Sequence, residues 1–163
     1  MKNLDALPAA RAAALRLLKF RPRSEEELRD RLSKKGFNEV AVQTVLDDLR
    51  RKGLVGDAQF ARYFAQQSSS GKLQGRRLLI SRLRAKGIQP EMARAAAESA
   101  MEGKDELELA RSAAAPRIAA LRELPRETAQ RRLSGYLGRR GFSGDVVYKV
   151  VKEICAKAGC DEE

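Results

Sequence analysis

The stretch RLRAKGIQPE, residues 82–91, contains a short pattern that occurs three times along the chain. The three copies align on Gly36, Gly87 and Gly141. Each has a leucine eight and four residues before its glycine, a basic residue directly before it and a large apolar residue directly after it. In chain order the aligned residues are Leu28, Leu32, Lys35 and Phe37, then Leu79, Leu83, Lys86 and Ile88, then Leu133, Leu137, Arg140 and Phe142.

The repeated pattern is typical of the end of an α-helix. Leucines four residues apart lie on one helical stripe, and the glycine supplies the left-handed residue at which the chain turns. Contact between the following apolar residue and the leucine four before the glycine closes a Schellman motif. A basic residue in the last turn suits the negative end of the helix dipole. Lys35, Lys86 and Arg140 are therefore explained without any binding partner.

A second helix is predicted directly after each glycine, and a further helix before each copy. Asn38, Gln89 and Ser143 occupy N-cap positions, and Pro90 fits the first helical position. Ser24 and Glu27 are spaced as a capping box. The preceding helices are predicted from Pro8 to Phe20, from Asp57 to the loop SSSGK, and from Lys104 or Asp105 towards Leu121 with an interruption at Pro116.

The glycines recur at intervals of about 50 residues, which is the sequence signature of a repeat array. We therefore predict an all-α chain of three tandem three-helix repeats that form an elongated, curved array. The predicted repeats are residues 1–53, 54–103 and 104–163, the last with a short C-terminal tail. No strand is predicted, because the few β-branched residues fall at helical spacing.

The composition favours a helical, binding protein over an enzyme. Of 163 residues, 34% are charged and 5% aromatic, and the chain has no histidine, so the commonest general base and metal ligand are absent. No phosphate-binding loop or dinucleotide fingerprint occurs. We expect no catalytic residue, no metal, no cofactor and no small-molecule substrate.

The two cysteines and the chain's first segment bear on its compartment. Cys155 is predicted to pack on a helix and Cys160 to lie in the tail, with a redox pair as the alternative. The N-terminal segment is too charged for a signal peptide, and no apolar run approaches the length needed to cross a bilayer. We expect a soluble, cytoplasmic protein without a membrane partner.

The formal net charge of +11 predicts a polyanionic partner, although a solvated face that only keeps the chain soluble is the alternative. No acidic residue occurs between Asp57 and Glu91. In a helix predicted from Leu73 to Lys86, Leu79 and Leu83 face the core, so Arg77 and Arg84 lie on the opposite face. The candidate partner-binding or nucleic-acid-binding residues are Arg76, Arg77, Arg82, Arg84, Lys86, Arg131, Arg132, Arg139, Arg140, Lys34 and Lys35.

Three segments resemble the signature of the RecX family of regulatory proteins. They are GRRLLISRLRAKGI (75–88), SEEELRDRLSKKGF (24–37) and YLGRRGFSGDVV (136–147). The resemblance implies tandem three-helix repeats and a non-enzymatic regulator that binds the RecA recombinase filament on single-stranded DNA. Such a regulator would inhibit recombinase, ATPase and co-protease activities, and would thereby modulate DNA repair, recombination and the SOS response. It also implies contact with single-stranded DNA, through or beside RecA.

Two other functions remain open from the residues alone. A stand-alone helical DNA-binding module would also use short glycine turns between helices, but the helices that follow the glycines are apolar and offer no full set of base-reading side chains. A scaffold that binds acidic proteins would also suit the net charge. Tight duplex binding without RecA would favour the first alternative, and capture of another acidic partner the second.

Overall fold

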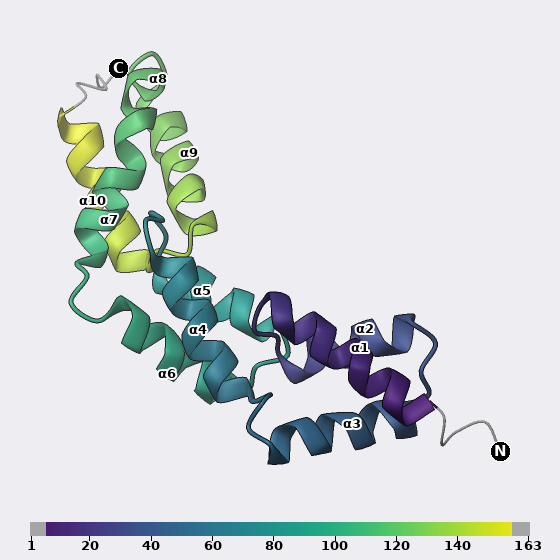
Figure 1. Cartoon of the computed structure of the whole chain (residues 1–163). Helices are drawn as coiled ribbons and strands as arrows, with labels where there is room; N and C mark the ends of the chain where they lie inside the picture. The colour runs from purple at the N-terminus through teal and green to yellow at the C-terminus, as the bar shows by residue number, and fades with distance from the viewer. Residues whose placement is uncertain (1–5, 158–163) are drawn as a thin grey trace. The chain divides into compact units, whose positions relative to one another are not determined.

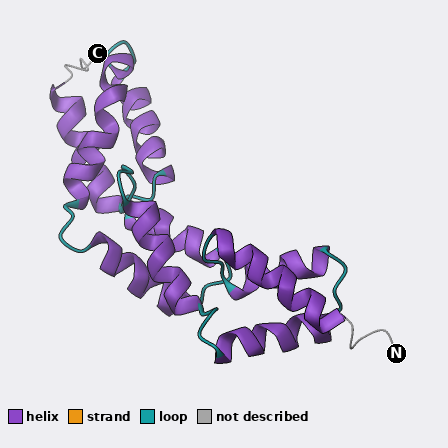
Figure 2. Ribbon diagram, in the orientation of Figure 1, coloured by secondary structure: helices purple, strands orange, loops and turns teal. Residues whose placement is uncertain are grey.

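A computed structural model describes residues 6–157, and within that range it contains helices and loops but no strand (Figure 2). The all-α prediction is therefore confirmed. Cys160 lies outside the described residues. In chain order the elements are α1 Ala6–Phe20, α2 Glu25–Lys34, α3 Glu39–Arg51, α4 Asp57–Ser69, α5 Arg76–Arg84, α6 Pro90–Met101, α7 Glu106–Ala114, the 3₁₀ helix η1 Ala115–Arg117, α8 Ile118–Leu121, α9 Arg126–Arg139 and α10 Gly144–Lys157 (Figure 1).

The chain divides into two compact units. The N-terminal unit comprises Met1–Gln66 and Leu83–Ala96, and the C-terminal unit comprises Gln67–Arg82 and Ala97–Glu163. Helices α1 to α3 pack together within the N-terminal unit, and α7, α9 and α10 pack together within the C-terminal unit (Figure 1). The predicted boundaries of three repeats stay a prediction.

The core of the N-terminal unit is aliphatic. Leu28 and Leu32 of α2 and Val42, Leu46 and Leu49 of α3 are buried. They pack against the small side chains Ala10, Ala13 and Ala14, which allow α1 to approach closely. Each fully buried leucine contributes about 2 kcal/mol through removal of apolar surface from water.

The core of the C-terminal unit has a similar design. Leu133 and Leu137 of α9 and Val150 of α10 are buried against alanines of α7. Phe142, the apolar residue after the third glycine, joins this core. Cys155 is buried on α10, which confirms its predicted packing on a helix.

All three predicted helix endings are confirmed. Gly36, Gly87 and Gly141 have φ of 87°, 80° and 81°, the left-handed region that glycine enters without steric cost. After each glycine, the amide of the apolar residue donates to the carbonyl of the leucine five residues back, at 3.3, 3.2 and 3.3 Å. These hydrogen bonds, from the amide of C″ to the carbonyl of C3, define a Schellman motif.

Three predicted N-caps are confirmed, among them Ser143, whose Oγ accepts from the amide of Val146 at 3.4 Å. Of the predicted capping box, the bond to the Ser24 hydroxyl is observed, while the Glu27 carboxylate has other partners. Asn38 Oδ1 accepts from the amide of Ala41 at 2.8 Å, and Ser24 Oγ accepts from the amide of Glu27 at 3.2 Å. The carboxylate of Glu27 accepts hydrogen bonds from Arg21 and Lys86. The spacing of the capping box therefore locates the start of α2 but not the partners of Glu27.

The helix predicted from Leu73 to Lys86 was too long. Helix α5 begins at Arg76 and ends at Arg84, so Leu73 lies in the preceding loop and Lys86 in the following turn. The physical reason at the start is that Gly75 donates its amide to the carbonyl of Arg140, not along a helix of its own. Pro116 lies in η1, between α7 and α8, as the predicted interruption requires.

Candidate basic interface

The third glycine corner fixes the start of α5. The amides of Gly75 and Arg77 donate to the carbonyls of Arg140 and Gly141 at 2.8 and 3.1 Å, and the amide of Arg76 donates to Glu106 Oε1 at 3.2 Å. These contacts satisfy amides that a helix start leaves without intrahelical partners. Arg76 and Arg77 are thereby held with their side chains exposed.

Two predicted site residues hold the loop before α5. Arg82 donates to Gln74 Oε1 at 3.0 Å, and the buried Gln74 side chain donates to the carbonyl of Ser68 at 2.6 Å. Arg140 donates to the carbonyl of Leu73 at 2.9 Å. Charge-assisted bonds of this kind restrict both guanidinium groups. Arg82 and Arg140 therefore have a structural task in addition to any contact with a partner.

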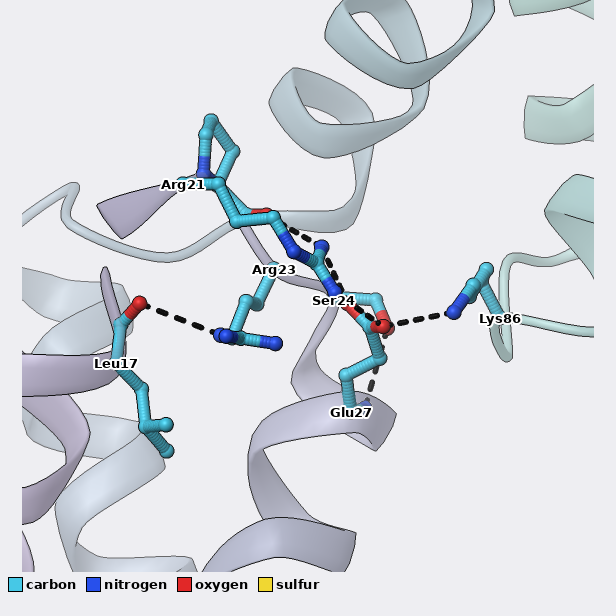
Figure 3. Close-up of polar contacts among 7 residues, drawn as sticks. Leu17, Arg21, Arg23, Ser24, Glu27 and Lys86 are labelled. Carbon is cyan, nitrogen blue, oxygen red and sulfur yellow. Dashed lines mark hydrogen bonds and ion pairs between the residues drawn. The ribbon is translucent and has the colours of Figure 1, made fainter. Parts of the chain in front are cut away.

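Lys86 belongs to an ion-pair cluster in the N-terminal unit (Figure 3). Its Nζ lies 2.7 Å from a carboxylate oxygen of Glu27, which is 2.9 Å from Arg21. Burial by itself would raise the pKa of Glu27, but hydrogen bonds from Arg21 and Lys86 outweigh it and lower the pKa to about 2. The positive charge of Lys86 is therefore offset inside the molecule.

The other candidates from the N-terminal unit have different surroundings. Lys35 is the C-cap of α2, as the helix-dipole explanation requires. Lys34 is exposed and lines a pocket that has both carboxylates, among them Glu26 and Asp30, and the cations Arg31 and Lys86. Arg84, the last residue of α5, is exposed and points away from the stripe that Leu79 and Leu83 bury, as predicted.

Helices α8 and α9 bring together three of the predicted residues. Arg131, Arg132 and Arg139 line one pocket of about 450 Å³, and each is exposed. Apolar groups that include Leu121 and Leu124 form part of the same pocket. The structure thus joins cationic side chains to an apolar wall, which suits a partner that carries both acidic and apolar groups.

Arg117 and Tyr136 complete this pocket, and neither was predicted from the sequence. The guanidinium carbons of Arg117 and Arg140 lie 4.7 and 4.9 Å from the centre of the Tyr136 ring, within the range of a cation–π contact. Tyr136 lies four residues after Arg132 and three before Arg139, on one face of α9. That helical spacing is the sequence signal that could have identified it.

The two units differ in how their cations are paired. In the N-terminal unit, Arg11, Arg51 and Lys52 all form ion pairs with Asp48. Burial opposes the change, but the hydrogen bond from Lys52, the largest influence, and the neighbouring arginines lower the pKa of Asp48. Within residues 6–157, by contrast, no ion pair to a carboxylate is formed by Arg76, Arg77, Arg84, Arg131, Arg132 or Arg139. Five of these six lie in the C-terminal unit, whereas in the N-terminal unit Arg84, Lys34 and Lys35 are the predicted residues that form no described ion pair.

Metal sites and membrane-spanning helices are two other classes of functional feature. Residues 6–157 contain no group of three or more His, Cys, Asp or Glu side chains placed to hold a metal ion. None of the described helices is long and apolar enough to cross a membrane. The exposed, unpaired arginines are therefore the main candidate for function.

Known proteins resemble this chain in sequence and in fold. A family model for the first three-helix domain of RecX matches residues 10–49, and one for its third three-helix domain matches residues 104–151. The chain is 37% identical over 145 residues to a regulatory protein RecX from Amycolatopsis mediterranei (strain U-32), covering 89% of this chain and 82% of the relative. It is 36% identical over 157 residues to one from Thermobifida fusca (strain YX), covering 96% and 84%.

Two solved structures share the fold. The crystal structure of RecX from Lactobacillus salivarius matches with a TM-score of 0.77 and 21% identity, over 92% of this chain and 97% of that chain. A crystal structure of regulatory protein RecX matches with a TM-score of 0.79 and 24% identity, over 90% and 73%. At these identities the likeness shows the fold alone.

Proposed function

The chain belongs to the RecX family of regulatory proteins, and from this premise we propose that it binds the RecA recombinase filament on single-stranded DNA. Binding would inhibit the recombinase, ATPase and co-protease activities of RecA. The protein would thereby modulate DNA repair, recombination and the SOS response. It acts by binding and not by catalysis, without a cofactor, a small-molecule substrate or a membrane partner, and it works in the cytoplasm.

The observation that carries this proposal is the set of exposed arginines without carboxylate partners in the C-terminal unit. A partner can neutralise these charges without first breaking an internal ion pair, so their attraction is available to an acidic groove or a DNA backbone. In the N-terminal unit, the cations that form ion pairs attract a partner less strongly, because nearby carboxylates partly offset their charge. We therefore assign first contact to Arg76, Arg77, Arg131, Arg132 and Arg139.

The presence of several repeats in one chain would strengthen binding further. We propose that residues 1–53, 54–103 and 104–163 act as three linked modules. When one module is bound, the next is held at a high effective concentration beside its own site, so several weak contacts give tight binding overall. An isolated module should then inhibit much less than the whole chain does.

The direct test is the ATPase activity of RecA on single-stranded DNA with the full chain titrated in. We expect inhibition at ratios well below one chain per RecA subunit, because one bound chain can affect growth of a whole filament. Full activity at equimolar ratios, with the chain shown to be folded by circular dichroism, would refute the proposal. A titration at raised salt should shift the curve to higher concentrations.

A stand-alone helical DNA-binding module is the second candidate. The grouping of Tyr136 with exposed arginines favours it, because single strands bind through cations and aromatic stacking. However, two guanidinium groups already lie over the Tyr136 ring, so a base could stack there only if they moved. Tight binding to DNA alone in a mobility-shift assay, unchanged by RecA, would favour this candidate.

A further inference from the structure

A second pocket, in the N-terminal unit, involves none of the exposed arginines discussed above. Its volume is about 320 Å³, and it lies among the last turns of α1, the α1–α2 linker and the segment that leads into α4. Leu15 and Leu54 line it and are 42% and 50% exposed, which is unusual for large apolar side chains. Phe60, which is buried, also contributes to the wall.

Arg23 lines the same pocket and is only 8% exposed. Its Nε donates to the carbonyl of Leu17 at 3.3 Å, as Figure 3 shows. Its Nη1 is buried and has no hydrogen-bond partner among the described residues. A guanidinium carries five donors and stays charged in proteins, so this group retains unused donor capacity inside an apolar wall.

The surroundings of Arg23 further destabilise the charged form of its guanidinium. Burial lowers the pKa of this guanidinium, and the nearby cations Arg21 and Arg31 lower it further. Glu27 acts in the opposite direction, but its carboxylate already accepts from Arg21 and Lys86. A buried charge without a counter-ion is strongly unfavourable. An anion bound to the Arg23 guanidinium would supply the counter-ion that the described residues do not provide.

We propose that this pocket binds a peptide segment of a protein partner in which a carboxylate lies next to an apolar side chain. The carboxylate pairs with the guanidinium of Arg23, and the apolar side chain fills the space between Leu15, Leu54 and Phe60. Lys19, which also lines the pocket, adds positive charge. A nucleic-acid backbone would supply the anion but nothing for the apolar wall. The proposal does not depend on RecA binding.

The test uses the full chain and four short probes, followed by NMR of the methyl groups of Leu15, Leu18, Leu54 and Val55. The first pair is acetyl-Leu-Glu-Phe-amide and its glutamine counterpart. The second pair is acetyl-Leu-Phe with a free carboxyl end and the same peptide as an amide, and it distinguishes a side-chain carboxylate from a terminal one. We expect millimolar binding, at least about tenfold tighter for a carboxylate than for its amide, as for a charge-assisted hydrogen bond.

The variant Arg23→Met removes the guanidinium and keeps an apolar stem. It should lose most of the carboxylate preference, with Lys19 as the remaining cation, and be at least as stable as the wild-type chain, because an unpaired buried charge is gone. Arg16→Met, an exposed change on α1, is the matched control and should keep the preference. If Arg23→Met does not fold, Arg23→Lys, which keeps the charge but loses the fork, should reduce the preference.

Three results would overturn the proposal. They are the absence of any carboxylate preference in the wild-type chain at millimolar probe, an equal preference in Arg23→Met or Arg23→Lys, and displacement of the glutamate peptide by oligothymidylate at equal concentration. The last result would make the pocket a phosphate site. Each of these results can occur whether or not the chain inhibits RecA, so the experiment tests this proposal independently of the proposed function.

Discussion

The N-terminal and C-terminal units end helices with the same corner but use their cations differently. In the N-terminal unit, Arg50 pairs with Glu25 and Asp47. In the C-terminal unit, the described ion pairs are those of Arg111 with Glu108 and Glu153, and the arginines of the α8–α9 pocket have none. Cations paired with carboxylates stabilise the fold, whereas the charge of unpaired cations remains available to attract an acidic partner. We therefore propose that the C-terminal unit contributes more of the energy of partner binding.

The first and third glycine corners also differ. Gly36 and Gly141 have nearly the same backbone conformation. A Cβ added at Gly36 would meet nothing within 4 Å, whereas one added at Gly141 would lie 2.1 Å from the backbone nitrogen of Leu78. Local geometry alone explains the first glycine, and the second is also required by tertiary packing.

The largest predicted effect tests this difference between corners. Gly141→Ala should lower the free energy of unfolding by about 3 kcal/mol or more, because strain at positive φ adds to a backbone clash. Gly36→Ala should cost only about 1–2 kcal/mol, the strain alone. Urea unfolding followed by circular dichroism measures both. Equal losses would show that Gly141 has no packing role.

A smaller effect is expected from Glu27→Gln, which removes the centre of the Arg21–Lys86 cluster. It should lower the free energy of unfolding by about 2 kcal/mol at neutral pH, because two cations lose their partner. The pKa of Glu27 is about 2 in the folded chain, below its unfolded value. Its contribution is therefore complete above the unfolded pKa and is lost as the pH falls towards 2.

Unfolding of both proteins between pH 7 and pH 2 checks the prediction, which requires the gap between them to close on the acid side. Glu108→Gln is the control, because Glu108 is exposed and its pair with Arg111, which also pairs with Glu153, should contribute little to stability. A gap that stays constant with pH would exclude the carboxylate charge as the source of the stability.

The next prediction concerns binding. It compares two triple variants, one in each unit, that change the net charge by the same amount. The triple variant Arg131→Gln/Arg132→Gln/Arg139→Gln should raise the concentration for half-inhibition of RecA ATPase about tenfold. The matched triple variant Arg11→Gln/Arg51→Gln/Lys52→Gln removes cations that share an ion pair with Asp48, so their charge is already partly offset. It should change that concentration by less than about threefold. Similar effects of both would mean that net charge alone drives binding.

The smallest predicted effect is that of Arg77→Glu/Arg84→Glu. Both side chains are exposed on α5, so the helical circular dichroism spectrum should stay unchanged. Inhibition should weaken by about threefold to fivefold, less than for the pocket arginines, because Arg131, Arg132 and Arg139 also adjoin an apolar wall that can contact a partner. Unchanged inhibition would remove the exposed face of α5 from the interface and leave the α8–α9 pocket as the main contact.

Local features of the fold were predictable because their causes are local. The leucine spacing, the left-handed glycines and the cap of Asn38 depend on residues within a few positions of one another, and all are observed. The start of α5 was not predictable in this way. Gly75 and Gly141 are far apart in sequence, and only the folded chain reveals that a Cβ on Gly75 would lie 2.2 Å from the carbonyl oxygen of Gly141.

The candidate site shows the same limit. Exposure of Arg77 and Arg84 followed from helical periodicity, because Leu79 and Leu83 fix the buried face. The sequence did not indicate that Glu27 neutralises Lys86 from 59 positions away, nor that Arg117 meets Tyr136. Both contacts arise from tertiary packing. Whether each predicted arginine touches a partner stays a prediction.

The central claim is that unpaired arginines of the C-terminal unit contact a RecA filament on single-stranded DNA. The most direct measurement is an electron cryomicroscopy reconstruction of the full chain bound to that filament. We predict that Arg131, Arg132 and Arg139 lie within ion-pair distance of RecA carboxylates or DNA phosphates. A complex in which these three side chains face solvent, while the paired cations of the N-terminal unit make the contacts, would contradict the account.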